Sequence, residues 1–355
     1  MRAFQIWKGE VKVSKSEELV IQVIELKGSY YQIGFEQGRQ LKAKILADIN
    51  GHDRVSNKKF QFLKAKKLLE KFSPNLLKEL RGLAKGLNIP LNVAIERYSG
   101  YDVLFPEMGC TTLVQDSYYV RNYDFSPTIY DARLVFVRPI DGYASVGFSQ
   151  QIIGRLDGMN EKGLVIGLHF VNHMHSQEGF IATTIVRMIL DQCANTEEAI
   201  ELITRVPHGF CYNYSITDFN GNSVIVEASP QQQIIKYAHP LICTNHFETE
   251  ELKQKNRVEI HGSIKRKQYL QALLKEKLDP LSAFHHFNSE KSPLFFDDYK
   301  NFFGTLHTVL YSPKDLNVII GVGKNSGPFI FSFKEWLQGS LRLPKMISGT
   351  IMQGE

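Results

Sequence analysis

The periodicity of apolar residues changes near residue 110, and this change limits the folds that the chain of 355 residues can adopt. The segment Glu18–Leu26 alternates and is rich in Val, Ile and Leu, which is typical of a strand, and helical spacing then predominates up to residue 98. From Cys110 onward, short β-rich runs separated by turn residues predominate, interrupted first by a pair of helical segments over 182–194 and 196–205. Helices followed by hairpins predict an α+β fold in which helices cover antiparallel sheets.

Local signals mark the ends of several of these elements. Gly28 and Ser29 precede a helix that we expect to run to about Ile49, and Thr196 is the expected capping residue of the helix over 196–205. The segment from Arg155 to Phe170 is expected to form two strands joined by a turn at Asn160–Gly163. Further helices are expected over 58–72, 74–87, 88–98, 263–274 and 279–287.

The first stretch whose residues could carry out catalysis is Gly109-Cys110-Thr111-Thr112. It is followed by Arg121 and then by Asp124, which lies 124 − 110 = 14 residues after the cysteine. That spacing fits a strand, a turn and a return strand, which would bring the three side chains together. A cysteine attacks as the thiolate, and Arg121 would favour the thiolate by lowering the thiol pKa. The alternative is a buried structural cysteine beside a structural Arg–Asp pair, and these residues alone leave both interpretations open.

A cut between Gly109 and Cys110 would extend this chemistry. The new α-amine has an ordinary pKa of about 7.7–8.0 and could act as general base for its own thiol, with Asp124 orienting it. Gly109 is flexible enough for the strained backbone that such autocleavage needs. We therefore predict that residues 1–109 form an N-terminal strand plus a helical propeptide-like segment, and that residues 110–355 form the catalytic domain.

Composition narrows the classes of function. A net charge of +5 is not typical of a nucleic-acid binder. The four cysteines (110, 193, 211 and 243) lack CxxC spacing, so we expect no metal and no cofactor. The chain has neither an apolar run long enough for a membrane span nor a signal-peptide pattern at Met1–Trp7, so a cytoplasmic protein is the expectation. The sequence carries no signal for or against a homo-oligomer.

Other patterns have two interpretations. His173 and His175 could bind a metal, but no third ligand is placed by spacing, so structural histidines are favoured. The glycine-rich run Gly321–Gly327 lacks phosphate-loop spacing and is better explained as a turn. Basic residues over 253–267 form either a solvated face or a handle for an anionic substrate such as an acyl-CoA. Aromatic residues including Phe170 and Phe210 could line an acyl pocket or pack in the core.

Four segments together resemble the N-terminal-nucleophile (Ntn) hydrolases of the penicillin acyltransferase branch, which are related to choloylglycine hydrolases and penicillin V acylases. Gly109-Cys110-Thr111-Thr112 is similar to the family's self-cleavage site, and Arg121-Asn122-Tyr123-Asp124 to its Arg-Asn-x-Asp motif. The segment from Asp157 to Leu164 is similar to its hairpin signature, and Thr244-Asn245 to its Thr-Asn element. Weaker similarities are Ser263-x-x-Arg266 and Tyr214-x-x-x-Asp218-x-x-Gly221 with Glu227.

The resemblance implies a four-layer αββα sandwich, the Ntn hydrolase fold. It also implies that Cys110 attacks an amide or thioester carbonyl, with the acyl-enzyme passing to water or to an amine. Asn245 would donate to the oxyanion, the backbone near His169 would supply a second donor, and Arg266 would be a second active-site arginine. The substrate would be a small acyl amide with a linear, non-peptide C–N bond, or an acyl-CoA-like thioester.

Two departures from the choloylglycine hydrolases favour the acyltransferase branch. The spacing of 121 − 110 = 11 residues between the cysteine and the arginine is shorter than in typical bile-salt hydrolases, and 109 residues precede the cysteine. The alternative to an enzyme is a catalytically silent relative that binds an acylated small molecule.

Overall fold

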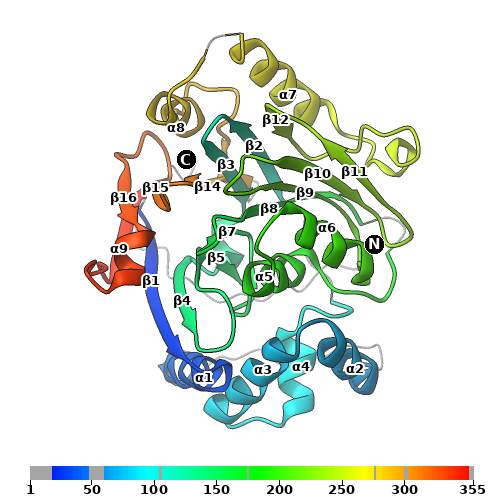
Figure 1. Cartoon of the computed structure of the whole chain (residues 1–355), viewed down its shortest axis with the longest axis vertical. Coiled ribbons are helices and arrows are strands. Elements are labelled where there is room, and N and C mark those ends of the chain that lie inside the picture. Colours follow the sequence, from blue (N-terminus) through cyan, green and yellow to red (C-terminus); the bar gives the residue numbers. More distant parts are fainter. Residues whose placement is uncertain are drawn as a thin grey trace.

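The computed structural model describes residues 18–47, 60–103, 106–173, 176–275, 277–299 and 303–351. Its centre consists of two β-sheets that lie face to face, and the helices cover their outer sides (Figure 1). The two sheets contact each other through β2 (Gly109–Gln115) and β8 (Val165–Asn172), among others. This contact places Cys110 at the interface between the sheets.

The first sheet has the strand order β11-β10-β9-β8-β7-β5-β4-β1-β17, with β6 paired to β5. Its neighbours are antiparallel except for β1 and β4, which run parallel. The hairpin predicted around Asn160–Gly163 is present as β7 and β8. The strands are β1 (Glu18–Gly28), β4 (Arg133–Pro139), β5 (Ser145–Gln150), β6 (Gly154–Arg155), β7 (Asp157–Asn160), β9 (Cys211–Thr217), β10 (Ser223–Ala228), β11 (Gln233–Tyr237) and β17 (Met346–Thr350).

The second sheet has the order β12-β2-β3-β14-β15-β16, with β13 paired to β14, and all its pairs are antiparallel. Its centre is the hairpin of β2 and β3, which carries Cys110 and Arg121. The strands besides β2 are β3 (Tyr118–Phe125), β12 (Leu241–Cys243), β13 (Asp297–Asp298), β14 (Phe303–Ser312), β15 (Asn317–Val322) and β16 (Phe329–Ser332).

Helices complete a four-layer arrangement. α5 (Ala182–Gln192) packs on the first sheet through β6, β7 and β8, and α6 (Thr196–Arg205) packs on β10 and β11. α7 (His261–Leu273) and α8 (Pro280–Asn288) cover the second sheet at the top of Figure 1. The predicted α+β class and the αββα layering are therefore confirmed. Smaller elements are η1 (Pro127–Ile129), η2 (Lys253–Lys255) and α9 (Phe333–Gln338).

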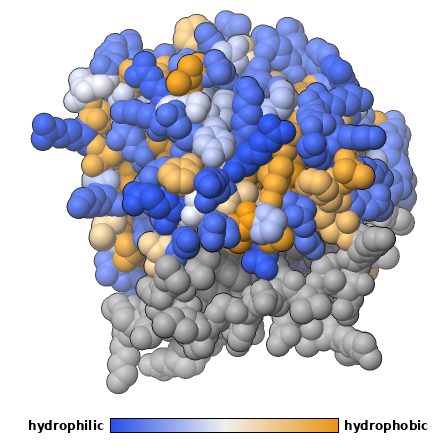
Figure 2. Space-filling view, turned by 90° about the horizontal axis from the view of Figure 1, so that it is seen from below, coloured by the Kyte–Doolittle hydropathy of each residue, from blue (hydrophilic) through white to orange (hydrophobic). Residues whose placement is uncertain are grey.

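The N-terminal helices form a further layer at the bottom of Figure 1. They are α1 (Tyr30–Ala47), α2 (Phe62–Phe72), α3 (Pro74–Leu87) and α4 (Leu91–Tyr98). The expected ends at Ile49 and residue 58 lie outside the described residues. On the face seen from below, hydrophilic and hydrophobic side chains are interspersed (Figure 2). Among the described residues, no helix combines the length and the apolar composition needed to span a bilayer.

Glycines let α1 and α3 cross at backbone contact. A Cβ on Gly34 would lie 1.9 Å from the carbonyl oxygen of Glu79, and a Cβ on Gly86 would lie 2.3 Å from that of Phe35. The same helix pair holds Glu79 fully buried, where its carboxylate contacts Arg187 of α5 at 2.5 Å. A buried ion pair thus joins the N-terminal helices to the layer that covers the first sheet.

The helix caps agree with the predictions at one helix and differ at another. Ser29 caps α1, because its hydroxyl accepts from the backbone of Gln32 while the Gln32 side chain accepts from the backbone of Ser29. The expected cap at Thr196 is wrong: the capping residue is Asn195, whose side chain accepts from the backbone N–H of Glu198 at 2.9 Å. An asparagine side chain accepts this hydrogen bond as well as a threonine side chain does, so the cap lies one residue before the predicted position.

Candidate active site

The β2–β3 hairpin brings Cys110 and Arg121 to one face. Arg121 lies directly opposite Thr112, and Thr112 shares a strand face with Cys110, so the cysteine and the arginine are diagonal neighbours. The Nη2 of Arg121 donates to the Sγ of Cys110 over 2.9 Å. The hairpin predicted from the 14-residue spacing is therefore present, and it brings these two side chains into contact.

Arg121 is held by groups of the opposite sheet. Its Nη1 and Nη2 donate to the carbonyl oxygens of Leu156 and Leu168 at 2.9 and 3.0 Å, and its Nε lies 3.4 Å from Oδ2 of Asp157. Gly167 makes room for the guanidinium, because a Cβ there would lie 2.3 Å from Nη1. The arginine therefore crosses from one sheet to the other beside the thiol.

Asp157 supplies the negative charge that balances the buried arginine. Tyr311 donates to its Oδ1 at 2.7 Å, and Nε2 of His307 lies 3.4 Å from its Oδ2. Burial alone would raise the pKa of Asp157, but Arg121 and His307 together hold it below the ordinary value. Asp157 is therefore ionised at neutral pH and keeps Arg121 in place.

The Cys110 thiol is completely buried in the uncut chain. Burial raises the pKa of this thiol to about 12, although Arg121 opposes the rise. The arginine thus acts in the direction expected from the sequence, but burial outweighs it. In this state the sulfur carries its proton at neutral pH.

Asp124 lies beside the peptide that precedes the cysteine. It is paired with Gly109 across the hairpin, and its Oδ1 accepts from Thr305 at 2.7 Å. Its Oδ2 is buried and has no hydrogen-bond partner among the residues that the structure describes. Burial raises the pKa of Asp124 to about 6, against the opposing charge of Arg266. A carboxylate with a free oxygen is therefore available next to the backbone of residues 109 and 110.

The side-chain amide of Asn245 contacts the backbone on both sides of Gly109. Its Oδ1 accepts from the backbone N–H of Cys110 at 2.9 Å and from Arg266 at 2.7 Å. Its Nδ2 donates to the carbonyl of Phe170 at 2.9 Å and contacts that of Met108 at 3.4 Å. Two donors on one side and two carbonyls on the other fix the orientation of the amide.

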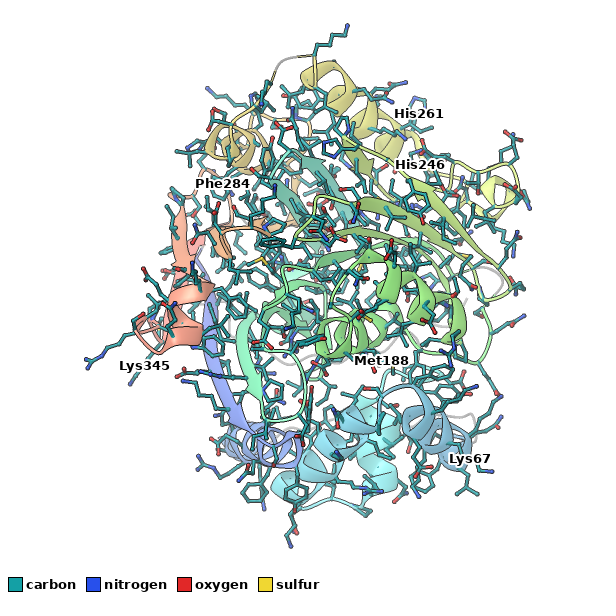
Figure 3. All side chains as sticks on the ribbon, viewed as in Figure 1. Lys67, Met188, His246, His261, Phe284 and Lys345 are labelled. Carbon is teal, nitrogen blue, oxygen red and sulfur yellow. The ribbon has the colours of Figure 1, made fainter. Side chains whose placement is uncertain are left out.

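Two residues of α7 support Asn245. The Ser263 hydroxyl accepts from the backbone N–H of Asn245 at 2.8 Å and also lies 2.8 Å from Nδ1 of His246. His246 is near His261, where α7 begins (Figure 3). The guanidinium of Arg266 lies over the ring of Phe296 at 4.9 Å, and its Nε is buried without a partner. The loose Ser263-x-x-Arg266 pattern thus places both residues on the same asparagine.

His169 lies on β8 within the same inter-sheet layer. Its Nε2 is 2.9 Å from the hydroxyl of Ser215, which in turn is 2.7 Å from that of Tyr119. Burial and the charge of Arg121 hold the pKa of His169 well below its ordinary value, so the ring is neutral. Its buried Nδ1 has no partner within hydrogen-bond criteria among the described residues, although the nearby backbone of Cys110 opposes part of this fall in pKa. The side chain as well as the backbone of this residue is therefore a polar group of the site.

Several supporting residues were missed from the sequence. Asp157 was recognised as part of a hairpin signature but not as the partner of Arg121, and Gly167 and Thr305 gave no signal of their contacts. The acidic residues of the weaker motif have other positions: Asp218 binds Thr196 at 3.0 Å, and Glu227 binds the backbone of Glu248 at 2.9 Å.

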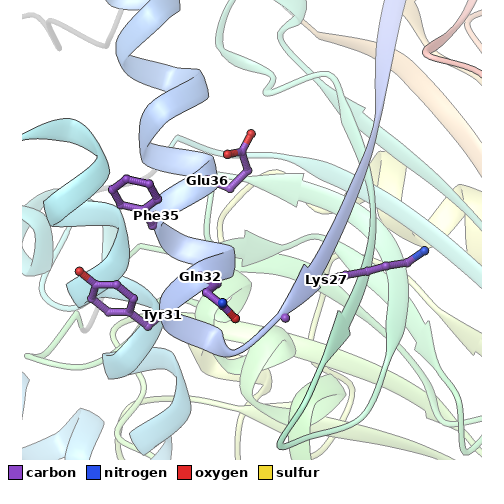
Figure 4. A pocket seen from close by; sticks show the side chains of 6 residues that line it. Lys27, Tyr31, Gln32, Phe35 and Glu36 are labelled. Carbon is purple, nitrogen blue, oxygen red and sulfur yellow. The ribbon is translucent and has the colours of Figure 1, made fainter.

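Other candidate sites are less well supported. Among the described residues, no three His, Cys, Asp or Glu side chains are grouped to hold a metal ion, and His175 lies outside them. Cys193, Cys211 and Cys243 are buried, and none of them forms a disulfide within the part of the chain that the structure describes. A surface hollow of about 530 Å³ at the β1–α1 turn contains none of the predicted site residues (Figure 4). It is lined by Lys27, Gly28, Tyr31, Gln32, Phe35 and Glu36.

Comparison with solved structures finds distant similarity. A conjugated bile acid hydrolase from Clostridium perfringens is 14% identical, with a TM-score of 0.47 over 64% of this chain and 93% of that one. Penicillin V acylase from Agrobacterium tumefaciens is 16% identical, with a TM-score of 0.42 over 64% and 86%. An N-acylethanolamine-hydrolyzing acid amidase orthologue from Caenorhabditis elegans is 12% identical, with a TM-score of 0.40 over 58% and 93%.

Comparison with curated proteins finds no match. The sequence pattern of one family, however, matches residues 112–326, which is 326 − 112 + 1 = 215 of the 355 residues. The matched region includes Arg121, Asp124, Asn245 and Arg266 and begins two residues after Cys110. The chain therefore belongs to the acyl-coenzyme A:6-aminopenicillanic acid acyl-transferase family.

Proposed function

We propose that the chain is a cysteine N-terminal-nucleophile enzyme that cuts itself between Gly109 and Cys110 and then transfers acyl groups through Cys110. The family to which the chain belongs is described by the transfer of an acyl group to an amine, that of 6-aminopenicillanic acid. The observation that carries the proposal is that both reactive atoms of one residue have polar partners. The Sγ of Cys110 accepts from Arg121, and its backbone nitrogen donates to Asn245.

Cleavage begins at the carbonyl of Gly109. The sulfur of Cys110 attacks this carbon, the C–N bond breaks, and the thiol proton passes to the departing nitrogen, which becomes the α-amine of Cys110. Water then hydrolyses the thioester and leaves a carboxylate on Gly109 and a free thiol. The neighbouring Oδ2 of Asp124, which has no partner in the uncut chain, is placed to accept from the new amine.

Cleavage also has to uncover the nucleophile. Met108, Gly109 and Cys110 are all buried, so no acyl substrate reaches the sulfur while the chain is intact. When Met108 and Gly109 move away, water enters and the largest cause of the raised thiol pKa is removed. The uncut chain is therefore an inactive precursor.

In turnover, the α-amine takes the thiol proton and the thiolate attacks the substrate carbonyl. The Nδ2–H of Asn245 that contacts the Met108 carbonyl becomes free to donate to the oxyanion, while its Oδ1 continues to accept from Cys110 and Arg266. Loss of one such donor costs about 10²–10³ in rate. The substrate C–N bond breaks, its nitrogen takes the proton from the ammonium, and water or an amine acceptor releases the acyl group.

The test compares the wild-type chain with Cys110→Ala by intact mass and by turnover of phenoxymethylpenicillin and N-acyl amino acids. The wild type is expected to give two fragments separated before Cys110, and the variant a single, inactive chain. Cys193→Ala is the matched control, since it replaces another buried free thiol and should be cut normally. A fully active chain that is never cut, or turnover by Cys110→Ala, would overturn the proposal. A cut chain that binds these compounds without converting them would instead be the silent relative.

A further inference from the structure

An ion pair holds the segment that precedes the proposed cut. The Nη1 of Arg257 lies 3.0 Å from Oε2 of Glu107, two residues before Gly109. The arginine side chain is 24% exposed and the glutamate side chain 56%. Glu107 belongs to the acyl side of the Gly109–Cys110 peptide, so this carboxylate is joined by the chain to the carbonyl that the sulfur would attack.

Arg257 differs from the lysines of its stretch. Its Nε is buried and, like that of Arg266, has no hydrogen-bond partner among the described residues. By contrast, Lys253 pairs with Glu250, Lys267 pairs with Glu248, and Lys255 donates to Gln231 at 2.6 Å. A buried guanidinium N–H without an acceptor is costly unless a ligand supplies one. Glu107 therefore satisfies only part of the hydrogen-bonding capacity of Arg257.

Two observations relate Arg257 to the proposed site. Burial lowers the pKa of Arg266, and the charge of Arg257 lowers it further, so the two arginines lie within electrostatic range of each other. The charge of Glu107 raises the pKa of His173 and the charge of Arg257 lowers it, so both lie near this ring. The ring centroid of His173 is 4.5 Å from that of Phe170. The carbonyl of Phe170 in turn accepts from Asn245. Arg257 thus acts electrostatically on a residue that contacts Asn245, and it pairs with a carboxylate on the acyl side of the Gly109–Cys110 peptide.

We propose that Arg257 binds a carboxylate at the far end of the substrate's acyl group, and that Glu107 occupies this place in the precursor. The inference rests on the proposed function, because the Gly109 carbonyl marks the position of the substrate carbonyl only if Cys110 attacks both. Once the cut releases Glu107, Arg257 and Arg266 remain as two neighbouring cations, and a second carboxylate restores the balance. The substrate class is an amide of a dicarboxylic acid.

The length of the acyl group follows from the covalent path. About ten bonds separate the Gly109 carbonyl carbon from the Glu107 carboxyl carbon, so an eleven-carbon diacid is the natural probe. Three chromogenic anilides test the site in the cut enzyme. The first is the mono-p-nitroanilide of undecanedioic acid, the second is its neutral methyl ester, and the third is N-undecanoyl-4-aminobenzoic acid, whose carboxylate lies on the amine side.

The wild type is expected to prefer the diacid anilide over its methyl ester by at least about tenfold in kcat/KM, since a hydrogen bond to a charged group is worth that much. Arg257→Gln should abolish the preference, mainly through KM, and Arg257→Lys should retain part of it. An unchanged ratio in Arg257→Gln would refute the site, as would a dependence on Arg257 confined to the aminobenzoate. Slower self-cleavage with the same ratio would show that Arg257 only holds the precursor.

A binding measurement separates this site from the proposed chemistry. Calorimetric titration with undecanedioate needs no turnover, and Glu107→Gln removes the internal carboxylate even if the chain stays uncut. Undecanedioate should bind Glu107→Gln at least about tenfold more tightly than the double variant Glu107→Gln/Arg257→Gln. Equal affinities would overturn the proposal whatever the enzyme does. Absence of cleavage together with a clear difference in affinity would overturn the proposed function and leave the site standing.

Discussion

The guanidinium of Arg121 occupies the space in which a side chain of residue 167 would begin, because a Cβ on Gly167 would lie 2.3 Å from Nη1. The two residues come from different sheets, and the contact exists only because β8 carries a glycine at this point. The guanidinium that contacts the Cys110 thiol therefore has room at this position because residue 167 has no side chain.

Gly167→Ala should displace Arg121, together with the Tyr119 hydroxyl, which would lie 2.2 Å from the new Cβ. The rate of acyl transfer should fall by about a hundredfold, the cost of misplacing a catalytic group by about 1 Å. The measurement is kcat/KM on whichever acyl amide the wild type hydrolyses, together with a melting curve. Gly327→Ala is the matched control, since no atom lies within 4 Å of its added Cβ. Full activity in a folded Gly167→Ala protein would show that Arg121 does not need this position.

Gly109→Ala should slow self-cleavage. A Cβ at this position would lie 2.5 Å from Cζ of Phe303 and 3.0 Å from Oδ2 of Asp124, so the scissile peptide would have to shift. Time courses of fragment formation on denaturing gels measure the effect. The double variant Gly109→Ala/Phe303→Leu removes the closer contact and should recover part of the rate. Cleavage of Gly109→Ala at the wild-type rate would mean that the scissile peptide tolerates a shift of this size.

Asp124→Asn should change the pH dependence of stability in the uncut protein, which Cys110→Ala provides. The folded pKa of Asp124 is about 6, above the ordinary value of about 3.9, so the folded state binds the proton more tightly. This contribution to stability is complete below about pH 4 and is lost as the pH rises through about 6.

Relative to Asp124→Asn, the parent protein should therefore lose at most about 3 kcal/mol between pH 4 and pH 7, and the difference should stay constant above that range. Urea unfolding at a series of pH values measures it. A parallel pH dependence of the two proteins would show that Asp124 titrates normally.

Glu79→Gln should destabilise the folded protein by about 3–5 kcal/mol, because Arg187 would keep a buried charge with one partner fewer. Arg205→Gln is the control: it breaks an exposed pair with Glu201 and should cost no more than about 0.5 kcal/mol. Urea unfolding gives both values. After cleavage, the variant should also lose the 1–109 fragment more readily on a sizing column. Equal costs of the two substitutions would contradict the structural role of the Glu79–Arg187 pair.

The elements that the sequence predicts well are those with local signals. The helix over 74–87 has the expected bounds because Pro74 begins it and Asn88, with a φ of 61°, ends it. The contact between Cys110 and Arg121 was predictable because both lie on one hairpin. No local signal indicated β17, because the strand with which it pairs, β1, is more than 300 residues earlier.

The rest of the site depends on packing between the sheets. Asp157 and Gly167 contact Arg121 because the first sheet packs against the second at this point. The spacing of residues in the sequence does not reveal how the two sheets pack. The burial of the Cys110 thiol has the same origin. The contact between Arg121 and the sulfur could therefore be predicted from the sequence, whereas the burial that keeps the sulfur protonated could not.

The position of β1 has a consequence for how the protein is made. This strand, which precedes the proposed cut, lies between β4 and β17, which both follow it. A polypeptide beginning at Cys110 would leave a gap one strand wide, with two bare edges that invite aggregation. Synthesis as a single polypeptide would thus let β1 pair before the proposed cut, and the cut would leave two fragments that β1 still holds together through its pairs with β4 and β17.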